Sequence, residues 1–451
     1  MERQMLRATI DKLKKNGYLE ICDVEVDPKY ELGGVLKHYK NERPMLFNKV
    51  RGSKTSVVGA LFGNREIYYD LLNVTHEERI AKFINAMMNP KPTKLLDKGP
   101  IMENILTRNI DLKSMLPVPT YHGKDSSSYI TSGMLVVKDP QTGKRYVSVR
   151  RFQMLKGNKM SALIASPFLT REFQALESKN KPLEVAVVLG YDANLLLASQ
   201  ISSETYGLDK YEVDSALRGE PLELVKCHSV DLEVPAHAEY VFEGIIPPNK
   251  RELEGPFGEL MGYYGSQAPH PIIEVKVIMH RNNPIFQTAF PCPQEHLSNG
   301  LIREIEVYSR LKALVDVKDV NVTIGGGYRF HVVASIHKKF DGDGKSAILG
   351  VLASSTDVKH VVIVDEDVNI FDHDEVEGAM ASRFQADHDL VVIGGALGSG
   401  LEPSHVVRGI TTKMGLDATK PLGDDCIKFE KARIPNFEKI DIKKYFPNIE
   451  K

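Results

Sequence analysis

The 451-residue chain lacks the features that mark several specialised classes of protein. It has no tryptophan, and its four cysteines are far apart and form no Cys-x-x-Cys pair, which argues against a disulfide framework and a structural zinc site. No apolar run approaches the roughly 20 residues that a membrane helix needs. The charged N-terminus has no apolar core of a signal peptide. These absences predict a cytoplasmic protein without a membrane partner.

An excess of charge of either sign is also missing, because 58 basic and 60 acidic residues leave a formal net charge of −2. Proteins that bind nucleic acid usually carry a basic patch, so we expect no nucleic-acid partner. The chain has no low-complexity tract, and its composition is that of a globular protein. A chain of this length is too long for one hydrophobic core, and two or three domains are expected.

Hydrophobic periodicity and turn residues divide the chain into three parts of an α/β (α+β) protein. Residues 1–112 mix helix and strand, beginning with an amphipathic helix over residues 1–20. Residues 113–312 contain successive hairpins and a further strand at 225–234, which indicates a barrel or a mixed sheet. Residues 313–451 alternate strand, helix and strand, as in an α/β domain with a parallel sheet.

The most informative segment is residues 254–259, with the sequence Glu-Gly-Pro-Phe-Gly-Glu. Proline and the two glycines disfavour a helix, and a regular strand would place its two carboxylates on opposite faces. The segment is therefore predicted to be a tight turn that brings Glu254 and Glu259 toward one point. Two converging carboxylates separate their pKa values and give one site an acid and an ionised partner. The alternative is a surface turn with two solvated glutamates.

Arg150 and Arg151 lie at the end of a predicted strand, so alternation directs one of them inward. A buried arginine needs a carboxylate partner, because an unpaired buried charge is strongly unfavourable. Glu254 and Glu259 are candidates for that partner. An edge strand with two solvated arginines is the alternative.

Four weaker patterns favour ordinary structural explanations. Residues 342–346 resemble the end of a phosphate-binding loop, but Lys339 occupies the position of the required glycine, so a polar loop is favoured. Residues 394–400 lack the spacing of a dinucleotide fingerprint and are interpreted as a flexible loop over a ligand or an interface. Residues 372–375 favour a solvated acidic helix start over a metal site. Lys413 either reaches an anion such as phosphate or is a solvated lysine.

Several segments together resemble the UbiD family of reversible (de)carboxylases, in the family's order from about residue 100 to 421. They are residues 129–133, 138–143, 151–153, 254–259, 364–368 and 413–419. The resemblance implies an N-terminal α/β part, a central split β-barrel like that of flavin reductases, and a C-terminal α/β domain that helps assembly into homodimers or hexamers. It also implies prenylated FMN, supplied by a partner flavin prenyltransferase, and an aromatic, heteroaromatic or α,β-unsaturated acid as substrate.

The chemistry of the family suits the residues. Loss of CO2 from an sp2 carbon leaves an electron pair that no side chain accepts, so an organic cofactor must serve as the electron sink. By resemblance, Arg151 is the catalytic arginine that orients a carboxylate, Glu254 the proton donor and Glu259 the acid that pairs with the arginine. Lys413 falls near the lysine that contacts the cofactor, and Gln153 and Lys210 are predicted to bind it as well.

The sequence departs from the family where three residues bind a divalent metal that clamps the cofactor phosphate. Tyr146, Phe168 and Lys210 occupy these positions, and they argue against both the divalent metal and the K+ of the family. Two consequences are open. Lys210 pairs directly with the phosphate, and the chain is an active reversible decarboxylase. Alternatively, the cofactor is lost and the chain is a non-catalytic subunit of a hetero-oligomeric aromatic carboxylase of the phenylphosphate carboxylase type. An ordinary flavin reductase is disfavoured, since no nicotinamide fingerprint is present.

Overall fold

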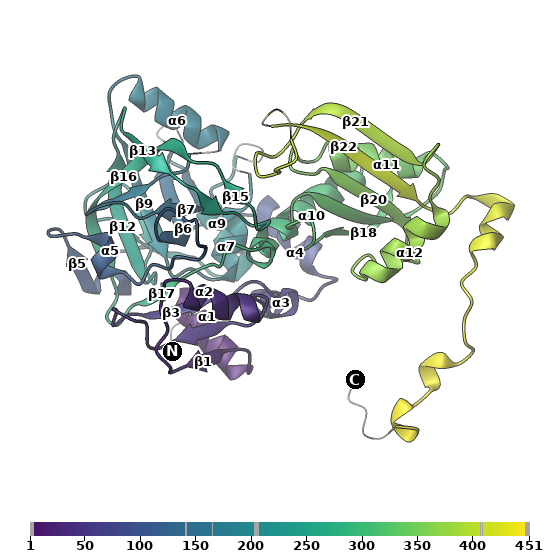
Figure 1. Ribbon diagram of the computed structural model, residues 1–451, viewed down its shortest axis with the longest axis horizontal. Helices are drawn as coiled ribbons and strands as arrows, with labels where there is room; N and C mark the ends of the chain where they lie inside the picture. The colour runs from purple at the N-terminus through teal and green to yellow at the C-terminus, as the bar shows by residue number, and fades with distance from the viewer. Residues whose placement is uncertain are drawn as a thin grey trace.

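The computed structural model describes residues 4–139, 142–164, 166–202, 207–405, 407 and 409–446. The N-terminal part lies against one side of a large central sheet, and the C-terminal sheet lies beside both (Figure 1). Both helices and strands build each part, so the predicted α/β class is confirmed. Among the described residues, no helix combines the length and apolarity that crossing a membrane requires.

The N-terminal part packs four helices around a small sheet. Its strands run in the order β1 (Glu20–Cys22), β2 (Met45–Phe47), β3 (Ser56–Gly59) and β17 (Ile285–Gln287). Its helices are α1 (Met5–Lys15), α2 (Glu31–His38), α3 (Arg65–Leu72) and α4 (Arg79–Met88). Helix α1 confirms the predicted amphipathic helix, since Met5, Ile10 and Leu13 are buried, although it ends at Lys15.

The central sheet has the path β13-β16-β12-β9-β6-β7, with β5 and β8 paired to β16. These strands are β5 (Asn104–Leu106), β6 (Tyr129–Lys138), β7 (Arg145–Gln153), β8 (Lys159–Ser161), β9 (Leu183–Leu189), β12 (Tyr240–Ile246), β13 (Arg251–Glu254) and β16 (Ala268–His280). No ladder joins β7 to β13 among the described strands, so the sheet does not close into a barrel. The two strands at the ends of the path still approach each other, because the site described below links their side chains.

Helices and short strands surround this sheet. The helices are α5 (Leu112–Met115), α6 (Pro167–Glu177), α7 (Ala193–Ser199) and α9 (Lys210–Arg218), with the 3-10 helices η1 (Pro100–Glu103) and η2 (Pro293–His296). The strands are β4 (Lys94–Leu96), β10 (Glu223–Lys226), β11 (Glu233–Pro235), β14 (Phe257–Gly258) and β15 (Tyr264–Gly265). The single strand predicted at 225–234 is wrong: β10 and β11 form a hairpin, because the Glu243 carboxylate accepts hydrogen bonds from the backbone of His228 and Ser229 and fixes a turn there.

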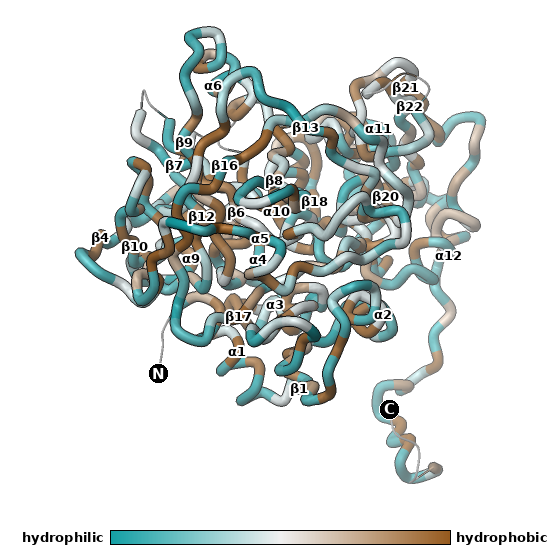
Figure 2. The backbone as a smooth tube through the Cα atoms, turned by 60° about the vertical axis from the view of Figure 1, so that its left-hand side comes forward, coloured by the Kyte–Doolittle hydropathy of each residue, from teal (hydrophilic) through white to brown (hydrophobic). Residues whose placement is uncertain are grey.

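Hydrophobic cores cover both faces of the central sheet. Neighbouring residues of β9 divide between them, with Val188 in the core on one face and Val187 in the core on the other. Apolar residues accordingly concentrate in the inner strands and polar ones in the peripheral loops (Figure 2). A sheet buried on both faces gives a continuous apolar strand sequence rather than strict alternation.

The C-terminal sheet has the order β18-β19-β20-β22-β21. Its strands are β18 (Asp316–Val322), β19 (His331–His337), β20 (His360–Asp365), β21 (Leu390–Leu397) and β22 (Ile410–Ala418), and its helices are α10 (Leu297–Leu311), α11 (Asp343–Leu352) and α12 (His373–Arg383). Only β19, β20 and β22 run parallel, so the predicted parallel sheet is corrected to a mixed one with antiparallel edges. Asp372 caps α12, as the acidic helix start predicted.

Two predicted loops of the C-terminal part are regular structure instead. Residues 342–346 include the start of α11 at Asp343, so they are not a polar loop. Residues 394–397 belong to β21, where the register shifts between Ile393 and Ala396. Gly395 has a φ of +70°, which a β-bulge needs and glycine adopts readily. The glycines there bend an edge strand, and only residues 398–400 follow it as a loop.

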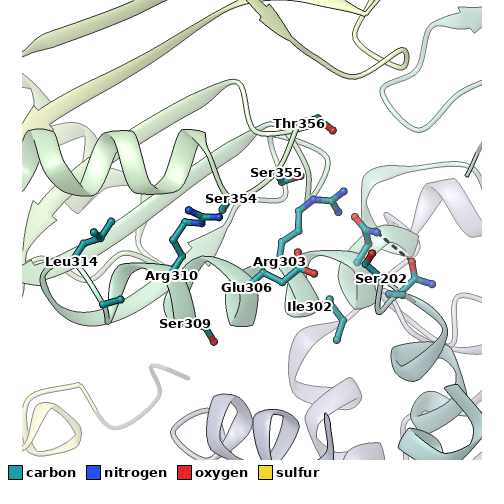
Figure 3. A pocket seen from close by; sticks show the side chains of 13 residues that line it. Ser202, Ile302, Arg303, Glu306, Ser309, Arg310, Leu314, Ser354, Ser355 and Thr356 are labelled. Atoms are coloured by element: carbon teal, nitrogen blue, oxygen red, sulfur yellow. Dashed lines mark hydrogen bonds between the residues drawn. The ribbon is translucent and has the colours of Figure 1, made fainter. Parts of the chain in front are cut away.

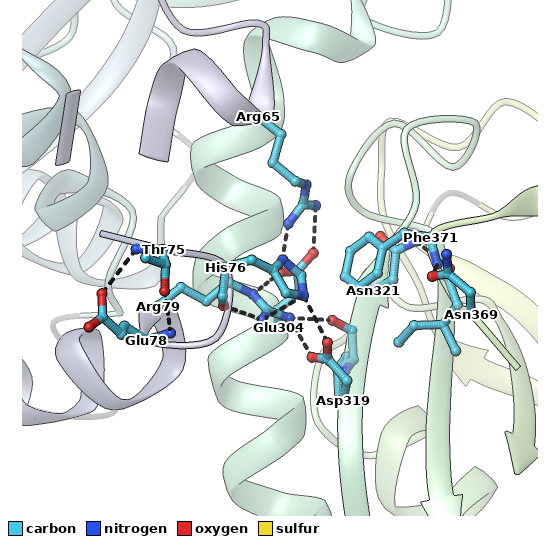
Figure 4. Close-up of polar contacts among 12 residues, drawn as sticks. Arg65, Thr75, His76, Glu78, Arg79, Glu304, Asp319, Asn321, Asn369 and Phe371 are labelled. Carbon is cyan, nitrogen blue, oxygen red and sulfur yellow. Dashed lines mark hydrogen bonds and ion pairs between the residues drawn. The ribbon is translucent and has the colours of Figure 1, made fainter. Parts of the chain in front are cut away.

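A network of buried charges ties the N-terminal part to the C-terminal one (Figure 4). Glu304 of α10 is fully buried and accepts hydrogen bonds from Arg65 of α3 at 2.7 Å and from Arg79 of α4 at 3.5 Å. Arg79 also pairs with Asp319 of β18. The guanidinium of Arg65 lies 5.2 Å from the ring of Phe371, beyond β20. One carboxylate of α10 therefore holds two helices of the N-terminal part, α3 and α4, against the C-terminal part.

The last described segment leaves the C-terminal sheet and runs outward from the body of the molecule (Figure 1). It contains three 3-10 turns, η3 (Gly423–Phe429), η4 (Phe437–Lys439) and η5 (Ile442–Lys444). Large apolar side chains are exposed along it, for example Ile427 at 76% and Phe437 at 66%.

Candidate active site

Arg151 meets the two glutamates of the 254–259 turn. Arg151 lies near the end of β7, and Glu254 is the last residue of β13, at the opposite end of the sheet path. Arg151 Nε lies 3.0 Å from Glu254 Oε1 and Nη2 lies 3.2 Å from Oε2, while Nη1 contacts Glu259 Oε1. The turn thus brings its two carboxylates onto one guanidinium, and the alternative of solvated glutamates does not apply.

Specific contacts fix the turn that carries the glutamates. Gly255 has a φ of +89°, and a Cβ there would approach Ser266 O at 3.0 Å, so glycine is required. The peptide bond between Gly255 and Pro256 is cis. Gln153 Oε1 accepts hydrogen bonds from Gly255 N at 2.9 Å and from the Tyr129 hydroxyl at 2.9 Å. Gln153, predicted to bind the cofactor, therefore uses its side-chain oxygen to hold the turn.

A second contact holds the far side of the turn, and no sequence pattern predicted it. Asp125 Oδ1 accepts a hydrogen bond from Gly258 N at 2.9 Å. A Cβ at Gly258 would lie 2.3 Å from the His122 ring, so the chain can pass there only as glycine. The Phe257 ring lies 4.8 Å from the Arg151 guanidinium and packs on Tyr129. Both ends of the turn are thus held against the central sheet.

The charged groups of the site are largely buried and paired with one another. The side chain of Glu254 is 1% exposed, that of Arg151 16% and that of Glu259 20%. Burial alone would lower the pKa of Arg151, but the charges of Glu259 and Glu254 outweigh it and raise the pKa above its ordinary value. Three guanidinium N–H groups are engaged, and the others remain for a further acceptor such as a substrate carboxylate.

A cavity of about 220 Å³ lies beside these residues. Arg151, Glu259 and Phe257 line it, together with Glu295 and His296 of η2, which the sequence reasoning missed. Burial raises the pKa of Glu295 to about 7, although a hydrogen bond from Asn41 opposes the shift. Burial, followed by the charges of Arg329 and Arg303, lowers the pKa of His296 to about 3. No local sequence pattern marked Glu295 and His296 as residues of the site.

A second cavity of about 260 Å³ continues from the first, since Val149, Arg150, Gln200, Asn299 and Arg329 line both. It is lined as well by the residues at the three expected metal positions, which the structure does bring together. The rings of Tyr146 and Phe168 stack with centroids 5.0 Å apart. Lys210 Nζ lies 4.9 Å from the centroid of the Tyr146 ring and donates a hydrogen bond to Ser199 O at 2.6 Å.

These residues do not fit a divalent cation. Two aromatic rings and an ammonium group occupy the positions where oxygen and nitrogen donors would be needed, and the Tyr146 hydroxyl is engaged with Ser166 at 2.8 Å. Within the described ranges, no group of three His, Cys, Asp or Glu side chains converges on a metal-sized point. Burial, followed by the charge of Arg150, lowers the pKa of Lys210 to about 7.

Lys413 does not reach these cavities. It lies on β22, is 5% exposed, and donates hydrogen bonds to Ser355 O at 3.1 Å and Leu352 O at 3.4 Å. Ser355 lines a third cavity of about 810 Å³ between α10 and the segment after α11 (Figure 3). Gln200 and Asn299, joined by a hydrogen bond of 3.2 Å, line all three cavities. Lys413 therefore supports the wall of the third cavity, separate from the residues around Arg151.

Comparison with known proteins identifies the family. Models of the N-terminal, Rift-related and C-terminal domains of 3-octaprenyl-4-hydroxybenzoate carboxy-lyase match residues 10–87, 94–294 and 296–418. The chain belongs to the UbiD family of carboxy-lyases. The resemblance inferred from the sequence is thereby confirmed, and the matched residues cover most of the chain.

Individual relatives of this UbiD-family chain agree over nearly its full length. Anhydromevalonate phosphate decarboxylase of Methanosarcina mazei is 36% identical, over 95% of this chain and 99% of that protein. The structure of the UbiD-class enzyme HmfF from Pelotomaculum thermopropionicum in complex with FMN is 42% identical with a TM-score of 0.94, over 98% and 99% of the two chains. An evolved dimeric form of HmfF in complex with prFMN is 40% identical with a TM-score of 0.90, over 98% and 100%.

Proposed function

We propose that the chain is a reversible decarboxylase of an aromatic or α,β-unsaturated acid and that it works with prenylated FMN. The observation that carries this proposal is the Arg151–Glu254–Glu259 contact beside a cavity, in a chain of the UbiD family. The FMN and prFMN complexes of HmfF support a flavin for this chain. When bound, the flavin supplies the electron sink that decarboxylation requires.

The residues of the chain have separate tasks in this proposal. The N–H groups of Arg151 that Glu254 and Glu259 leave free bind and orient the substrate carboxylate. Glu254 delivers a proton to the carbon that loses CO2 and takes it back in the reverse direction. Glu259 stays paired with Arg151, so the charge of the guanidinium is balanced while Glu254 changes its protonation. Gln153 and Asp125 are positioning residues, because they hold the turn rather than the reactants.

The two continuous cavities are proposed to hold the flavin. Each is small for such a ligand, but joined they reach the range of ligand sites, roughly 300–1,000 Å³. Phe257, Leu260 and Phe290 give the first cavity apolar walls suited to planar rings and to an unsaturated acid. Such walls also exclude water from the position of proton transfer.

Further features of the family are proposed for this chain on the same basis. A flavin prenyltransferase supplies the cofactor. The central sheet is a split β-barrel, and the three domains comprise residues 1–112, 113–312 and 313–451. We also infer a homo-oligomer, because the exposed apolar side chains after residue 420 would be covered by a second copy. The dimeric form of HmfF supports this assembly.

A second candidate function is a non-catalytic subunit of a hetero-oligomeric carboxylase. The stacked rings of Tyr146 and Phe168 favour it, since they replace the ligands of a metal that the family uses with its cofactor. The Arg151 site counts against it, because a subunit without chemistry has no need for a proton donor next to a cavity.

The test is to produce the chain together with a flavin prenyltransferase, purify it, and record its visible spectrum and its turnover. We expect a bound flavin and CO2 release from at least one member of a panel of aromatic, heteroaromatic and α,β-unsaturated acids. Incorporation of labelled bicarbonate into the acid tests reversibility. A colourless protein that is inactive on the whole panel and purifies with a second UbiD-like chain would overturn the enzyme proposal in favour of the subunit.

A further inference from the structure

The second cavity has the composition of an anion site. The cationic side chains of Arg150, Lys210 and Arg329 line it, and no aspartate or glutamate is among the described residues that line it. The hydroxyl groups of Ser148 and Ser166 also line it, and their oxygens accept hydrogen bonds from Arg150 and Tyr146, so each keeps its own O–H as a donor. A cavity that gathers cations and hydroxyls but no acid repels metal ions and attracts a group such as phosphate.

The charges of Lys210 and Arg150 are not compensated by any carboxylate in the part of the chain that the structure describes. Lys210 is 3% exposed, and no carboxylate of the described residues lies within ion-pair distance of its ammonium, which donates one hydrogen bond to a backbone carbonyl. Arg150 donates to the neutral oxygens of Ser148 at 3.2 Å and Tyr146 at 3.1 Å. A buried cation without a counter-ion is unfavourable, so the site is built for an anion from outside the chain.

Arg329 adds positive charge that Asp357, its acidic partner among the described residues, does not balance. Asp357 Oδ2 accepts a hydrogen bond from Arg329 Nη1 at 2.8 Å and also one from Arg303, so two guanidinium groups share one carboxylate. Arg329 Nε is buried and has no hydrogen-bond partner. This donor and the surplus positive charge lie at the cavity that Lys210 and Arg150 line.

We propose that this chain holds the terminal phosphate of a flavin mononucleotide directly on Lys210, Arg150 and Arg329, without a bridging divalent cation. The inference rests on the flavin-binding part of the proposed function. The position of this cavity suits the phosphate end of a flavin mononucleotide, because Val149, Gln200 and Asn299 line both this cavity and the one at Arg151. The Tyr146 ring holds the Lys210 ammonium by a cation–π contact in place of a metal ligand.

The test compares FMN with riboflavin, which lacks the phosphate, in fluorescence titrations of the purified flavin-free chain. In the presence of EDTA we expect FMN to bind about 10- to 100-fold more tightly than riboflavin, as charge-assisted hydrogen bonds to a phosphate imply. Added Mn2+ should change the Kd of FMN less than about twofold. This comparison needs no variant, so it does not depend on the folding of a mutant.

Variants then assign the effect to the ammonium. Lys210→Met should lower the affinity for FMN about 10- to 100-fold and leave the affinity for riboflavin unchanged. Lys338→Met is the matched control, because the Lys338 side chain is 8% exposed and donates to a backbone carbonyl at 2.9 Å. Lys338 directly follows β19, pairs with the exposed Asp341 at 3.5 Å and is not among the residues that line the cavity. This variant should bind both flavins as the unaltered chain does.

The outcomes separate this inference from the proposed function. Tight FMN binding that EDTA abolishes and Mn2+ restores would overturn the metal-free site while leaving the flavin proposal intact. Equal binding of FMN and riboflavin would overturn the phosphate site alone. Binding of neither flavin under either condition would overturn the flavin part of the proposed function, and this inference with it.

Discussion

Replacing Glu254 with glutamine tests the proton donor directly. The substitution keeps the shape of the side chain but removes the negative charge that accepts hydrogen bonds from Arg151 Nε and Nη2 at 3.0 and 3.2 Å. In one of these contacts the side-chain NH2 group of the glutamine would face an N–H group of Arg151, so two donors would meet at a side chain that is 1% exposed. Since Arg151 keeps Glu259, we expect the free energy of unfolding to fall by about 2 kcal/mol, less than when a buried charge loses its only partner.

The effect of Glu254→Gln on turnover should be far larger than its effect on stability. A positioned general acid contributes roughly 10²- to 10⁴-fold to the rate, which corresponds to about 3–5 kcal/mol in the activation barrier. The assay is the initial rate of CO2 release per bound flavin, with flavin content measured from the absorption spectrum. We expect flavin content close to that of the unaltered chain and turnover reduced at least about 100-fold.

Glu252→Gln is the matched control, because Glu252 lies on the same strand, its side chain is 41% exposed, and its partner is the exposed Lys159. It should change turnover less than about twofold. If Glu254→Gln kept more than about a third of the turnover at equal flavin content, the proton would come from another group and the role given to Glu254 would be wrong.

Two further predictions concern buried acids. Glu304→Gln should lower the free energy of unfolding by about 3 kcal/mol or more and reduce the melting temperature, because Arg65 and Arg79 lose their shared carboxylate. The control Glu66→Gln, at an exposed position of α3, should change neither quantity. An unchanged melting temperature of Glu304→Gln would refute the bridging role of Glu304. Burial raises the pKa of Glu295 in the folded chain to about 7. The folded state therefore holds this proton more tightly than the unfolded state does. The resulting contribution to the free energy of unfolding is full below the pKa of an unfolded glutamate and is lost as the pH rises through 7. Glu295→Gln should therefore reduce the loss of stability between about pH 5 and about pH 8 by up to about 3 kcal/mol; equal urea midpoints of the two proteins at each pH would show that Glu295 does not titrate in this range.

Local sequence patterns predicted many elements and some of the site. The hairpin of β6 and β7, the amphipathic helix α1 and the capped start of α12 follow from periodicity and turn residues. The turn at 254–259 also follows from its own glycines and proline. The need of a buried arginine for acid partners pointed to Arg150 or Arg151, and the family resemblance selected Arg151. Where such patterns were ambiguous they misled: a glycine-rich segment interpreted as a loop is a bulged edge strand, because an edge strand tolerates a bulge that a central one would not.

Other site residues could not be found from local patterns. Nothing in the sequence around Glu295, His296 or Arg329 shows that they line the cavities next to Arg151, since their positions depend on how α10 and the C-terminal sheet pack on the central sheet. Lys413 lay in a motif of the family, yet its ammonium is held by backbone carbonyls of its own domain. The structure thus places Lys413 away from Arg151, although the family motifs had assigned both residues to one site.

The sequence by itself determined an arginine at a strand end and two acids on a tight turn, and it placed aromatic rings and a lysine at the positions where the family resemblance predicts metal ligands. These are properties of single residues and their immediate neighbours, so a linear pattern records them. The tertiary structure alone decided that Lys210 meets Arg150 and Arg329 at one cavity continuous with Arg151. These segments are far apart in the chain. The contacts of α9 and α7 with β7, and of α10 with α7 and β18, bring their charges together.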